Sequence, residues 1–410
     1  MAESTKTTAQ RLETVTQAAL NGVVLAAKSQ AAVCGLTHKF YRYPARFSPE
    51  FARAVIQAFT KPGDTVFDPF MGGGTALVEA AVLGRKAVGI DLNPLAVFVS
   101  RAKTTPLTES DIVEIRRWSA ILSAALNLGN PALLANDWAR FGYLRNLSGR
   151  TTWPIRKALE LGLMQVKRLP TRPQRHFARC LLLKTAQWAL DCRSTVPSVN
   201  DFRQRLFQHL EDMLAGASEY KGALAHIRKL HGAPTAKPYC FARSVIGVEK
   251  DKRLAPIFPP ALILTSPPYP GVHVLYHRWQ VQGRRETPAP FWIAGSVDGN
   301  GASYYTFGDR KGPGLTSYYR NLRAAVRSLS MIADRHTMLV QLVAFSDASW
   351  QLRSYLEIME EVGFREIEFR SICSSKDGRI WRRVPNRKWY ASQKKGIMSS
   401  MEVVLFHRLA

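Results

Sequence analysis

The sequence contains no CxxC pair, and its five cysteines are scattered and odd in number. This argues against a cysteine-bound zinc site or a disulfide framework and favours a reducing cytoplasm. Also missing is any run of about 18 apolar residues, so we expect no membrane-spanning helix and no membrane partner. The apolar stretch nearest the N-terminus is broken by Asn21, Lys28 and Gln30, which predicts a leading helix and not a signal peptide.

Acidic residues are scarce relative to basic ones. The chain has 57 Lys and Arg against 31 Asp and Glu, a formal net charge of +26. A surface this basic favours a polyanionic partner, and nucleic acid is the first candidate. The alternative is an arginine-rich protein without such a partner. The length of 410 residues and the 46% hydrophobic content allow one large domain with an insertion, or two domains.

The pattern of predicted elements divides the chain into three parts. Residues 1–37 are interpreted as a loosely tethered helical extension. Residues 38–104 and 239–410 alternate short apolar strands with helices, which predicts an α/β fold with a mostly parallel twisted sheet. Residues 105–238 show helical periods and no clear strand, and within them Arg140–Arg179 holds ten Lys or Arg and one acid. We interpret residues 105–238 as a basic helical insertion and a candidate region for nucleic-acid recognition.

A glycine-rich turn, "DPFMGGGT" (Asp68–Thr75), connects a predicted strand to a predicted helix. Glycines allow a tight turn and the close approach of a ligand, and the helix N-terminus supplies free N–H groups. Asp91 ends the next predicted strand, where nucleoside-binding units place an acid on ribose hydroxyls. Leu77 replaces the third glycine of a dinucleotide fingerprint, and no lysine follows Gly74 as a P-loop requires.

The acid that precedes the glycines narrows the choice of ligand. Asp68 would repel a pyrophosphate, whereas it suits a nucleoside that carries a cationic amino group. S-adenosylmethionine is such a nucleoside. The alternative is a tight turn that binds no ligand.

A second motif, "TSPPY" (Thr265–Tyr269), ends the predicted strand "ALILTS". Ligands of open α/β sheets bind at the carboxyl ends of the strands. The two prolines fix the backbone, so that the hydroxyl of Ser266 and the carbonyl of Pro267 are preorganised acceptors for the hydrogens of an amine. The alternative is a strand end followed by a proline turn and a core tyrosine.

The motifs "DPFMGGGT", "VGIDLNP" and "TSPPY" together resemble the amino-methyltransferases of DNA, which modify the exocyclic nitrogen of cytosine or adenine. The stretch "HKFYRYPARFSP" is similar to the cofactor-clasping segment of that family. The resemblance covers roughly residues 38–104 and 239–410. It implies a Rossmann-like methyltransferase fold, S-adenosylmethionine as cofactor, double-stranded DNA as partner, and a target base flipped out of the duplex. It also implies a cytoplasmic, nucleoid-associated protein and raises a cognate restriction endonuclease as a partner.

The resemblance assigns roles residue by residue. The candidate catalytic residues are Ser266, Pro267, Pro268 and Tyr269, and the ring of Tyr269 is expected to stack on the flipped base. The candidate cofactor-binding residues are Tyr43, Pro44, Asp68, Pro69, Phe70, Gly72, Gly74, Thr75, Asp91, Leu92 and Asn93. Charge and position, and not the resemblance, suggest the candidate nucleic-acid contacts: Arg284 and Arg285 in the segment after the TSPPY motif, and Arg382, Arg383 and Arg387 in the basic stretch Lys376–Lys395. No metal is expected, because the i, i+4 pair His273 and His277 has no third ligand beside it.

Serine in the first position of the motif favours cytosine N4 over adenine N6. Methylation at cytosine C5 is disfavoured, because that chemistry needs a thiolate in a Pro-Cys context and none of the cysteines follows a proline. Adenine N6, on DNA or on RNA, is the alternative within enzymes. A nucleic-acid-binding protein with an inactive methyltransferase fold is the alternative from another class.

Two departures from the family pattern and a second basic region complete the sequence analysis. The catalytic motif follows the cofactor motif, whereas many serine-type members have the reverse order. The third predicted strand lacks the usual acid at its end, since only Ser244 lies nearby and Glu249 and Asp251 come later. Lys376–Lys395 carries eight cations and one acid with aromatic residues between them, and it competes with the insertion as the DNA-binding surface. Either region could instead be a solvated face.

Overall fold

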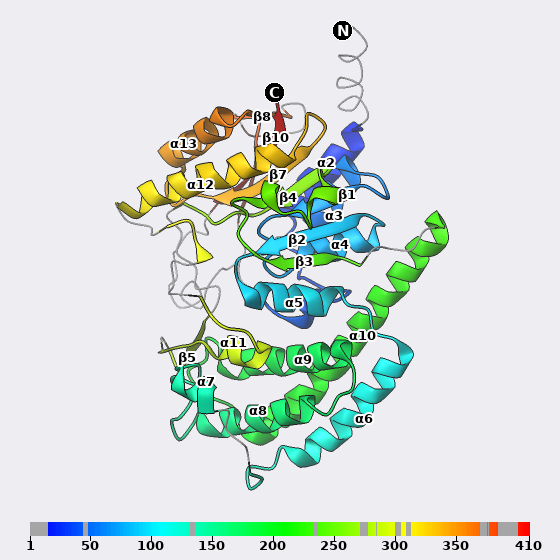
Figure 1. Ribbon diagram of the computed structural model, residues 1–410, viewed down its shortest axis with the longest axis vertical. Helices are drawn as coiled ribbons and strands as arrows, with labels where there is room; N and C mark the ends of the chain where they lie inside the picture. The colour runs from blue at the N-terminus through cyan, green and yellow to red at the C-terminus, as the bar shows by residue number, and fades with distance from the viewer. Residues whose placement is uncertain are drawn as a thin grey trace.

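The computed structural model describes residues 15–43, 48–131, 136–232, 237–270, 278–283, 285–299, 305–308, 313–369, 375, 377–383 and 401–410. In Figure 1 a sheet covered by helices occupies the upper half of the molecule, and a group of helices from the middle of the sequence occupies the lower half.

One mixed sheet forms the centre of the upper half. Its strands are β1 (Thr65–Asp68), β2 (Lys86–Asp91), β3 (Tyr239–Ala242), β4 (Leu262–Thr265), β7 (Met338–Ala344), β8 (Phe364–Glu366), β9 (Ile380–Arg383) and β10 (Met401–Leu409). They follow the order β3-β2-β1-β4-β7-β10-β8, and β9 also pairs with β10. The first five are parallel, whereas β10 runs antiparallel to β7, β8 and β9. The predicted Rossmann-like α/β fold is thereby confirmed.

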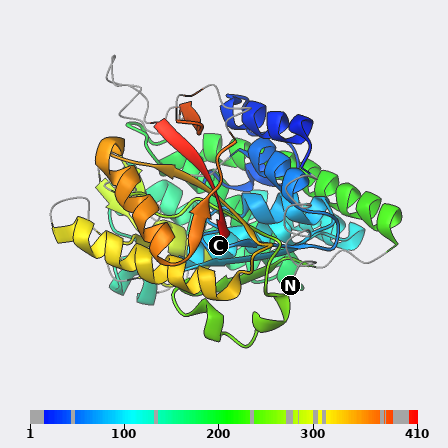
Figure 2. The same ribbon diagram turned by 90° about the horizontal axis from the view of Figure 1, so that it is seen from above.

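Helices cover both faces of this sheet, as the view from above shows (Figure 2). On one face lie α2 (Gln17–Lys28), α3 (Pro49–Phe59) and α4 (Thr75–Val82), and on the other lie α12 (Pro313–Ile332) and α13 (Ala348–Glu361). Successive strand residues point to opposite faces. Thus Val66 and Leu262 join the core under the first group of helices, while Phe67 and Ile263 join the core under the second.

The residues predicted to form a helical insertion, 105–238, are mainly helical in the structure. The helices of the insertion are α6 (Glu109–Ala125), α7 (Asn136–Arg140), α8 (Trp153–Val166), α9 (Arg172–Leu190) and α10 (Val199–His231). Helix α5 (Pro94–Thr104) lies between the sheet and this group, and its side chains belong to the same apolar core as those of α8, α9 and α10. In the part of the chain that the structure describes, no helix is both long and apolar enough to cross a membrane.

A segment from the second half of the chain also packs onto the insertion. It consists of β5 (Trp279–Val281), β6 (Arg285–Thr287) and α11 (Ala289–Ala294), and β5 and β6 form a two-stranded antiparallel sheet. The side chains of Trp279, Val281 and Phe291 lie in the core of the insertion. The insertion is therefore not a separate body, because it shares its core with residues on both sides of it in the sequence. The 3-10 turns are His38–Phe40, Val248–Lys250 and Ala255–Ile257.

Two segments differ from the expectations drawn from the sequence. Helix α2 is present within the N-terminal extension, but Val23 and Ala27 are buried in the core beneath the sheet, so this helix is not loosely tethered. The basic stretch after residue 376 contains the strand β9, which sequence analysis missed. Along β9, Ile380 and Arg382 are buried while Arg383 is exposed, which is the alternation of a strand at a sheet.

Two glycines of α10 should respond oppositely to replacement by alanine. Alanine is normally favoured over glycine inside a helix by about 0.5–1 kcal/mol. A Cβ at Gly216 would lie 2.2 Å from the carbonyl oxygen of Leu36, whereas a Cβ at Gly222 would meet no atom within 4 Å. We therefore expect Gly216→Ala to lower the free energy of unfolding by about 1–3 kcal/mol and Gly222→Ala to raise it by about 0.5–1 kcal/mol. Urea unfolding of both variants measures this. Equal stabilisation by both would show that α10 does not approach residue 36 this closely.

Candidate active site

The two sequence motifs meet at one edge of the sheet. Strand β1 pairs in parallel with both β2 and β4, so the carboxyl ends of the three strands lie side by side. Asp68, Asp91 and Thr265 are the last residues of these strands. The glycine-rich turn follows β1, and Ser266 follows β4. The structure thus brings together the residues that sequence analysis assigned to the cofactor and to the target base.

Asp68 is a buried carboxylate, with only 2% of its surface exposed. Its Oδ1 accepts hydrogen bonds from the backbone N–H of Phe70 at 3.1 Å and from the hydroxyl of Thr265 at 2.8 Å. Among the described residues, none donates a hydrogen bond to its Oδ2. Burial raises the pKa of Asp68 to about 7, against the opposing effect of these two hydrogen bonds. Asp68 therefore offers one carboxylate oxygen that a cationic ligand could use.

Asp91 holds the glycine-rich turn in place. Its Oδ2 accepts a hydrogen bond from the N–H of Gly72 at 2.9 Å, and its Oδ1 accepts one from the N–H of Asn93 at 2.8 Å. Burial raises the pKa of Asp91 to about 6. Because each carboxylate oxygen has two lone pairs, both can accept a further bond from a hydroxyl group. Leu92 and Asp91 are partly exposed next to the turn.

The glycines of the turn are required by the protein's own packing. Gly72 and Gly74 have φ of 46° and 72°, in the region that favours glycine. A Cβ at Gly72 would lie 3.2 Å from the ring of Tyr43, and a Cβ at Gly74 would lie 2.6 Å from the hydroxyl oxygen of Ser100. The sequence interpretation attributed this space to a ligand. In the structure, side chains of the clasp segment and of α5 fill it.

The clasp segment is fixed to the turn by polar contacts. The side-chain amide of Asn93, which also caps α5, donates to the hydroxyl of Tyr43 at 3.1 Å. Lys103 of α5 is fully buried and its ammonium donates to the carbonyl of Gly73 at 2.8 Å. His38 lies 2.7 Å from the carboxylate of Glu79 on α4. These contacts join the clasp, the turn and two helices into one rigid unit.

The remaining residues of the glycine-rich motif lie around the same turn. Pro69 and Thr75 are buried, and Thr75 is the first residue of α4. The ring of Phe70 is partly exposed and meets the ring of Phe307 edge to face, with centroids 5.5 Å apart. Pro44 lies outside the described residues. Sequence analysis did not identify Ser100 and Lys103, which also contact the turn, because they carry no motif.

The catalytic motif opens a chain of hydrogen bonds. The hydroxyls of Ser266 and Tyr269 lie 2.8 Å apart, and the hydroxyl of Tyr269 donates to Oε1 of Glu402 on β10 at 2.9 Å. Oε2 of Glu402 accepts from Nε of Arg382 on β9 at 2.9 Å. Tyr318 of α12 donates its hydroxyl to the carbonyl of Pro268 at 2.8 Å. Among the described residues, the carbonyl of Pro267 accepts no hydrogen bond.

This chain fixes which atom donates at Ser266. A tyrosine hydroxyl has one hydrogen, and a carboxylate that pairs with a guanidinium can only accept. The hydrogen of Tyr269 is therefore used by Glu402, so the hydroxyl of Ser266 must donate to Tyr269. Ser266 is partly exposed, and the lone pairs of its hydroxyl oxygen are left for another donor. Ser266 is thus prepared to accept a hydrogen bond and not to donate one.

The ring of Tyr269 was expected to be open for stacking on a base, but in the structure Tyr269 is buried. Only 5% of its surface is exposed, and its hydroxyl is held between Ser266 and Glu402. In this structure its contribution to the site is therefore its hydroxyl. Stacking of a base on the ring stays a prediction. Sequence analysis could not identify Glu402, since a single acid at the start of an apolar strand carries no recognisable signal.

The arginines predicted to contact nucleic acid are not brought together. Arg382 is 7% exposed, and its guanidinium donates a hydrogen bond to Glu402, the residue that accepts from Tyr269. Arg382 is therefore too buried to contact a phosphate. Arg285 on β6 and Arg383 on β9 are exposed, but β6 packs with the insertion while β9 pairs with β10 of the main sheet. Arg284 and Arg387 lie outside the described residues.

One of the acids that follow β3 forms ion pairs within the protein. Asp251, one of the acids that follow β3, binds Arg243 and Arg253 at 2.6 Å each, and these bonds lower its pKa.

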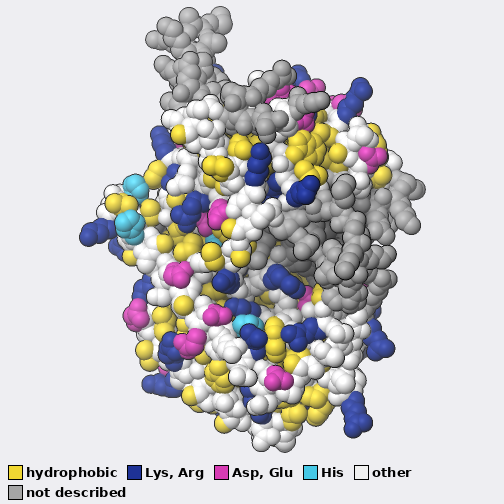
Figure 3. All heavy atoms as spheres, turned by 180° about the vertical axis from the view of Figure 1, so that it is seen from behind, with side chains coloured by type: hydrophobic (Ala, Val, Ile, Leu, Met, Phe, Trp, Pro, Cys, Tyr) yellow, Lys and Arg dark blue, Asp and Glu magenta, His cyan; other side chains and the backbone are white. Residues whose placement is uncertain are grey.

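No group of three or more His, Cys, Asp or Glu that could hold a metal occurs among the described residues. His273 and His277 lie outside them. On the face seen in Figure 3, Lys and Arg side chains are spread among acidic ones and form no single patch.

Replacing Asp68 by asparagine should stabilise the protein in the absence of ligand. The folded-state pKa of about 7 is above the ordinary value of 3.8, so between these values the folded protein binds more protons than the unfolded chain. The free energy of unfolding must then fall as pH rises from about 4 to 7. Asp68→Asn removes this loss, so it should be more stable than wild type by about 4 kcal/mol at pH 8 and by about 2 kcal/mol at pH 5. Urea unfolding at both pH values tests this, and a less stable variant at pH 8 would contradict it.

Comparisons with known proteins find a family that matches the segment with the glycine-rich turn, and relatives that match short parts of the chain. Residues 20–100 match the DNA methylase family of N6 and N4 methyltransferases. The chain is 42% identical to the type II methyltransferase M.MvaI of Kocuria varians over 80 residues. This stretch is 19% of this chain and 18% of that protein. Over 54 residues it is 43% identical to a tRNA (guanine(10)-N2)-dimethyltransferase of Methanocaldococcus jannaschii, covering 13% of this chain and 15% of that protein.

Among solved structures, an rRNA methyltransferase, aviRa, from Streptomyces viridochromogenes aligns with 94% of this chain and 90% of its own at 12% identity and a TM-score of 0.29. The chain spans about a fifth or less of the length of the curated relatives it matches. The motif TSPPY (Thr265–Tyr269) lies outside residues 20–100, the segment that matches the family. Within these limits the resemblance drawn from the motifs is confirmed: residues 20–100 match the DNA methylase family of N6 and N4 methyltransferases.

Proposed function

We propose that this protein transfers a methyl group from S-adenosylmethionine to an exocyclic amine of a base in DNA, with N4 of a flipped-out cytosine as the target. The observation that carries the proposal is the hydrogen bond from Thr265 to Asp68. It joins the end of β4, where Ser266 begins the catalytic motif, to the buried carboxylate that begins the glycine-rich turn. A cofactor held by the turn and a base held by Ser266 would therefore be neighbours.

The residues around the turn fit S-adenosylmethionine. Asp68 has a buried carboxylate oxygen that no described residue uses, and an ammonium group is a suitable partner for it. Asp91 is partly exposed at the end of β2 and can accept bonds from ribose hydroxyls. When bound, the cofactor supplies the methyl group. The protein's own residues contribute binding and orientation, through Asp68, Asp91 and the backbone of the turn.

Ser266 and Pro267 would act on the amine. The lone pair of an exocyclic amine is delocalised into the base, so the nitrogen is a poor nucleophile. Acceptors that hold both amine hydrogens turn the nitrogen toward tetrahedral geometry and release its lone pair. The hydroxyl of Ser266 is fixed as an acceptor by Tyr269 and Glu402, and the carbonyl of Pro267 is unused among the described residues. Both lie on a backbone that the prolines hold rigid.

We further propose that the insertion, residues 105–238, contributes to DNA binding. Of the ten cations between Arg140 and Arg179, four are partly buried, and three of these have partners in the protein. Arg156 pairs with Glu160, Arg175 donates to the carbonyl of Leu169, and Arg179 donates to the carbonyl of Ile293. The six exposed cations are Arg140, Arg145, Arg150, Lys167, Arg168 and Arg172. Those six, with Arg285 and Arg383, are the groups available to phosphates.

A second candidate function is methylation of an exocyclic amine in RNA. It is favoured by the 43% identity with a tRNA (guanine(10)-N2)-dimethyltransferase over 54 residues. The catalytic chemistry would be the same, since an exocyclic amine is again the acceptor of the methyl group. Adenine N6 of DNA is the third possibility, and serine in place of an acid at position 266 is the reason for preferring cytosine. A DNA methyltransferase would act at the nucleoid in the cytoplasm, and a cognate restriction endonuclease would be its partner.

Nucleoside analysis tests the proposal directly. DNA and, separately, RNA are incubated with the protein and S-adenosylmethionine, digested to nucleosides and examined by mass spectrometry. We expect N4-methylcytosine from DNA, reduced roughly 100-fold or more by Ser266→Ala, because one oriented acceptor of the transition state is lost. N6-methyladenine would refute the choice of base, and product from RNA alone would favour the second candidate. Calorimetry of S-adenosylmethionine binding is the control, and Ser266→Ala should leave that affinity unchanged.

The variant Tyr269→Phe separates the two roles of this residue. Phenylalanine keeps the ring for stacking and removes only the hydroxyl that receives the hydrogen of Ser266. Without it, the hydroxyl of Ser266 can turn and point its hydrogen at the amine. We expect kcat to fall roughly tenfold, with little change in KM for DNA, since the energy of one hydrogen bond to a charged network is lost. Full activity of Tyr269→Phe together with loss of activity in Tyr269→Ala would assign the residue to stacking alone.

A further inference from the structure

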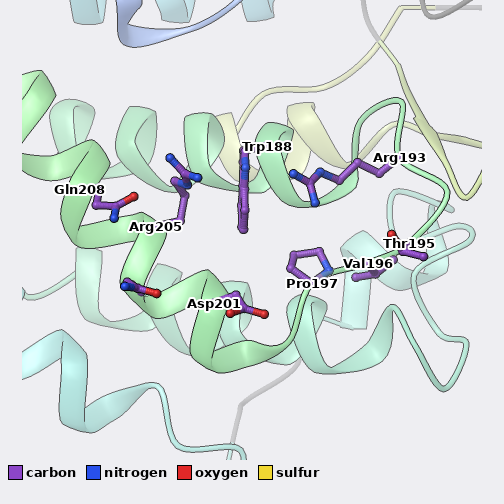
Figure 4. Close-up of a pocket in the computed structure, with 9 residues that line it drawn as sticks. Trp188, Arg193, Thr195, Val196, Pro197, Asp201, Arg205 and Gln208 are labelled. Atoms are coloured by element: carbon purple, nitrogen blue, oxygen red, sulfur yellow. The ribbon is translucent and has the colours of Figure 1, made fainter.

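A pocket in the insertion contains two arginines held on either side of one tryptophan (Figure 4). Trp188 lies near the end of α9, Arg193 in the following loop and Arg205 on α10. Their guanidinium carbons are 4.6 Å and 4.9 Å from the centre of the indole ring. Figure 4 shows the two guanidinium groups on opposite sides of the indole. Both are thus held in place by cation–π contacts.

The charge of this pocket is only partly balanced by the protein. The guanidinium groups of Arg193 and Arg205 form no ion pair or hydrogen bond with the residues that the structure describes. Among those residues, the one acid that lines the pocket is Asp201. Its Oδ2 accepts from the backbone N–H of Ser198 at 3.2 Å and from the hydroxyl of Ser198 at 2.7 Å, as part of the capping box of α10. Two guanidinium groups and one carboxylate leave the pocket with a net positive charge, which favours the entry of an anion.

The size and lining of the pocket indicate what kind of anion fits. Its volume is about 300 Å³, which is much larger than a single phosphate group needs. Gln204 and Gln208 also line it. They are four residues apart on α10 and so lie on the same face of the helix, where their amides can bond to a sugar or a base edge. The pocket therefore suits a phosphate together with an attached nucleoside.

The loop that carries Arg193 is fixed to the segment that follows the catalytic motif. The N–H of Cys192 donates to the carbonyl of Gln280 at 2.8 Å, and the N–H of Gln280 donates to Asp191 at 3.2 Å. Arg193 forms a bridge with Val281 of β5. β5 is the first described strand after Tyr269. A DNA strand bound in the pocket would thus have a defined position relative to the segment that follows the TSPPY motif.

We propose that Trp188, Arg193 and Arg205 form a binding site for a backbone phosphate and its nucleoside in the DNA substrate. The inference rests on the proposed function in taking DNA as the ligand. The site is outside the Arg140–Arg179 region and outside every motif that the sequence displays. It is a second point of attachment, separate from the site of methyl transfer.

The test measures DNA binding in the absence of S-adenosylmethionine. A fluorescently labelled duplex is titrated with wild type, with the double variant Arg193→Ala/Arg205→Ala and with the control Arg228→Ala/Lys229→Ala. The control removes two exposed cations from the last turn of the same helix, about 35 Å from Arg205 along its axis. We expect the first variant to raise Kd by at least roughly tenfold. It should also reduce the slope of log Kd against log salt by about 2, because two phosphate contacts are lost. The control should change neither quantity.

Unchanged Kd and salt slope in a folded Arg193→Ala/Arg205→Ala protein would overturn the proposal. Thermal unfolding checks the fold. Should the double variant unfold, Arg193→Gln alone carries the test, since this residue is in a loop, and a slope reduced by about 1 is then expected. Competition with adenosine monophosphate and with inorganic phosphate distinguishes the sources of the ligand. Displacement of DNA by millimolar mononucleotide from wild type but not from the variant would support the contact with DNA, because both ligands would then share the pocket. Binding of the mononucleotide in the pocket without any displacement of DNA would assign the pocket to free nucleotides and overturn the contact.

Methyl transfer is measured on the same variants to keep the two proposals apart. A wild-type protein that transfers no methyl group but loses DNA affinity on Arg193→Ala/Arg205→Ala would refute the proposed function and keep the pocket. Normal methyl transfer, with DNA affinity equal in wild type and variant, would keep the proposed function and refute the pocket.

Discussion

The hydrogen bond between Thr265 and Asp68 is the contact on which the candidate site depends. It exists because β1 and β4 are parallel neighbours, which brings their carboxyl ends to the same edge of the sheet. It also stabilises the carboxylate that burial disfavours, since burial raises the pKa of Asp68 to about 7. The protein thus keeps a destabilising group at the point where both motifs meet. Such a cost is expected at functional sites and not in a core built for stability.

Buried charges elsewhere in the site act through the backbone and through other side chains. Lys103 donates to the turn from within α5, and Glu402 receives bonds from Tyr269 and Arg382. Removing one partner of such a buried group leaves an uncompensated charge, so these residues hold one geometry firmly. This explains why Arg382, in a stretch that looks like a nucleic-acid-binding surface, is instead used inside the fold.

The insertion is part of the same structure as the site. Its apolar core includes Tyr41 and Tyr43 of the clasp as well as Trp279, which follows the catalytic motif. Trp279 donates its indole N–H to the hydroxyl of Tyr41 at 3.1 Å, which connects the two segments directly. The insertion therefore stabilises the segments around the glycine-rich turn, in addition to any contact it makes with nucleic acid. The Trp188 pocket is built on the same framework.

Local sequence was sufficient to predict the parts of this protein whose structure is set by near neighbours. The strand ending at Asp68, the glycine-rich turn, and the strand ending at Thr265 were predictable, because apolar runs, glycines and prolines act within a few residues. The tertiary structure alone placed β9 beside β10, turned Arg382 inward, and set Glu402 behind Tyr269. It also placed Arg205 across the indole of Trp188 from Arg193. These contacts join residues far apart in the chain, and their energies depend on burial, which no short stretch of sequence reports.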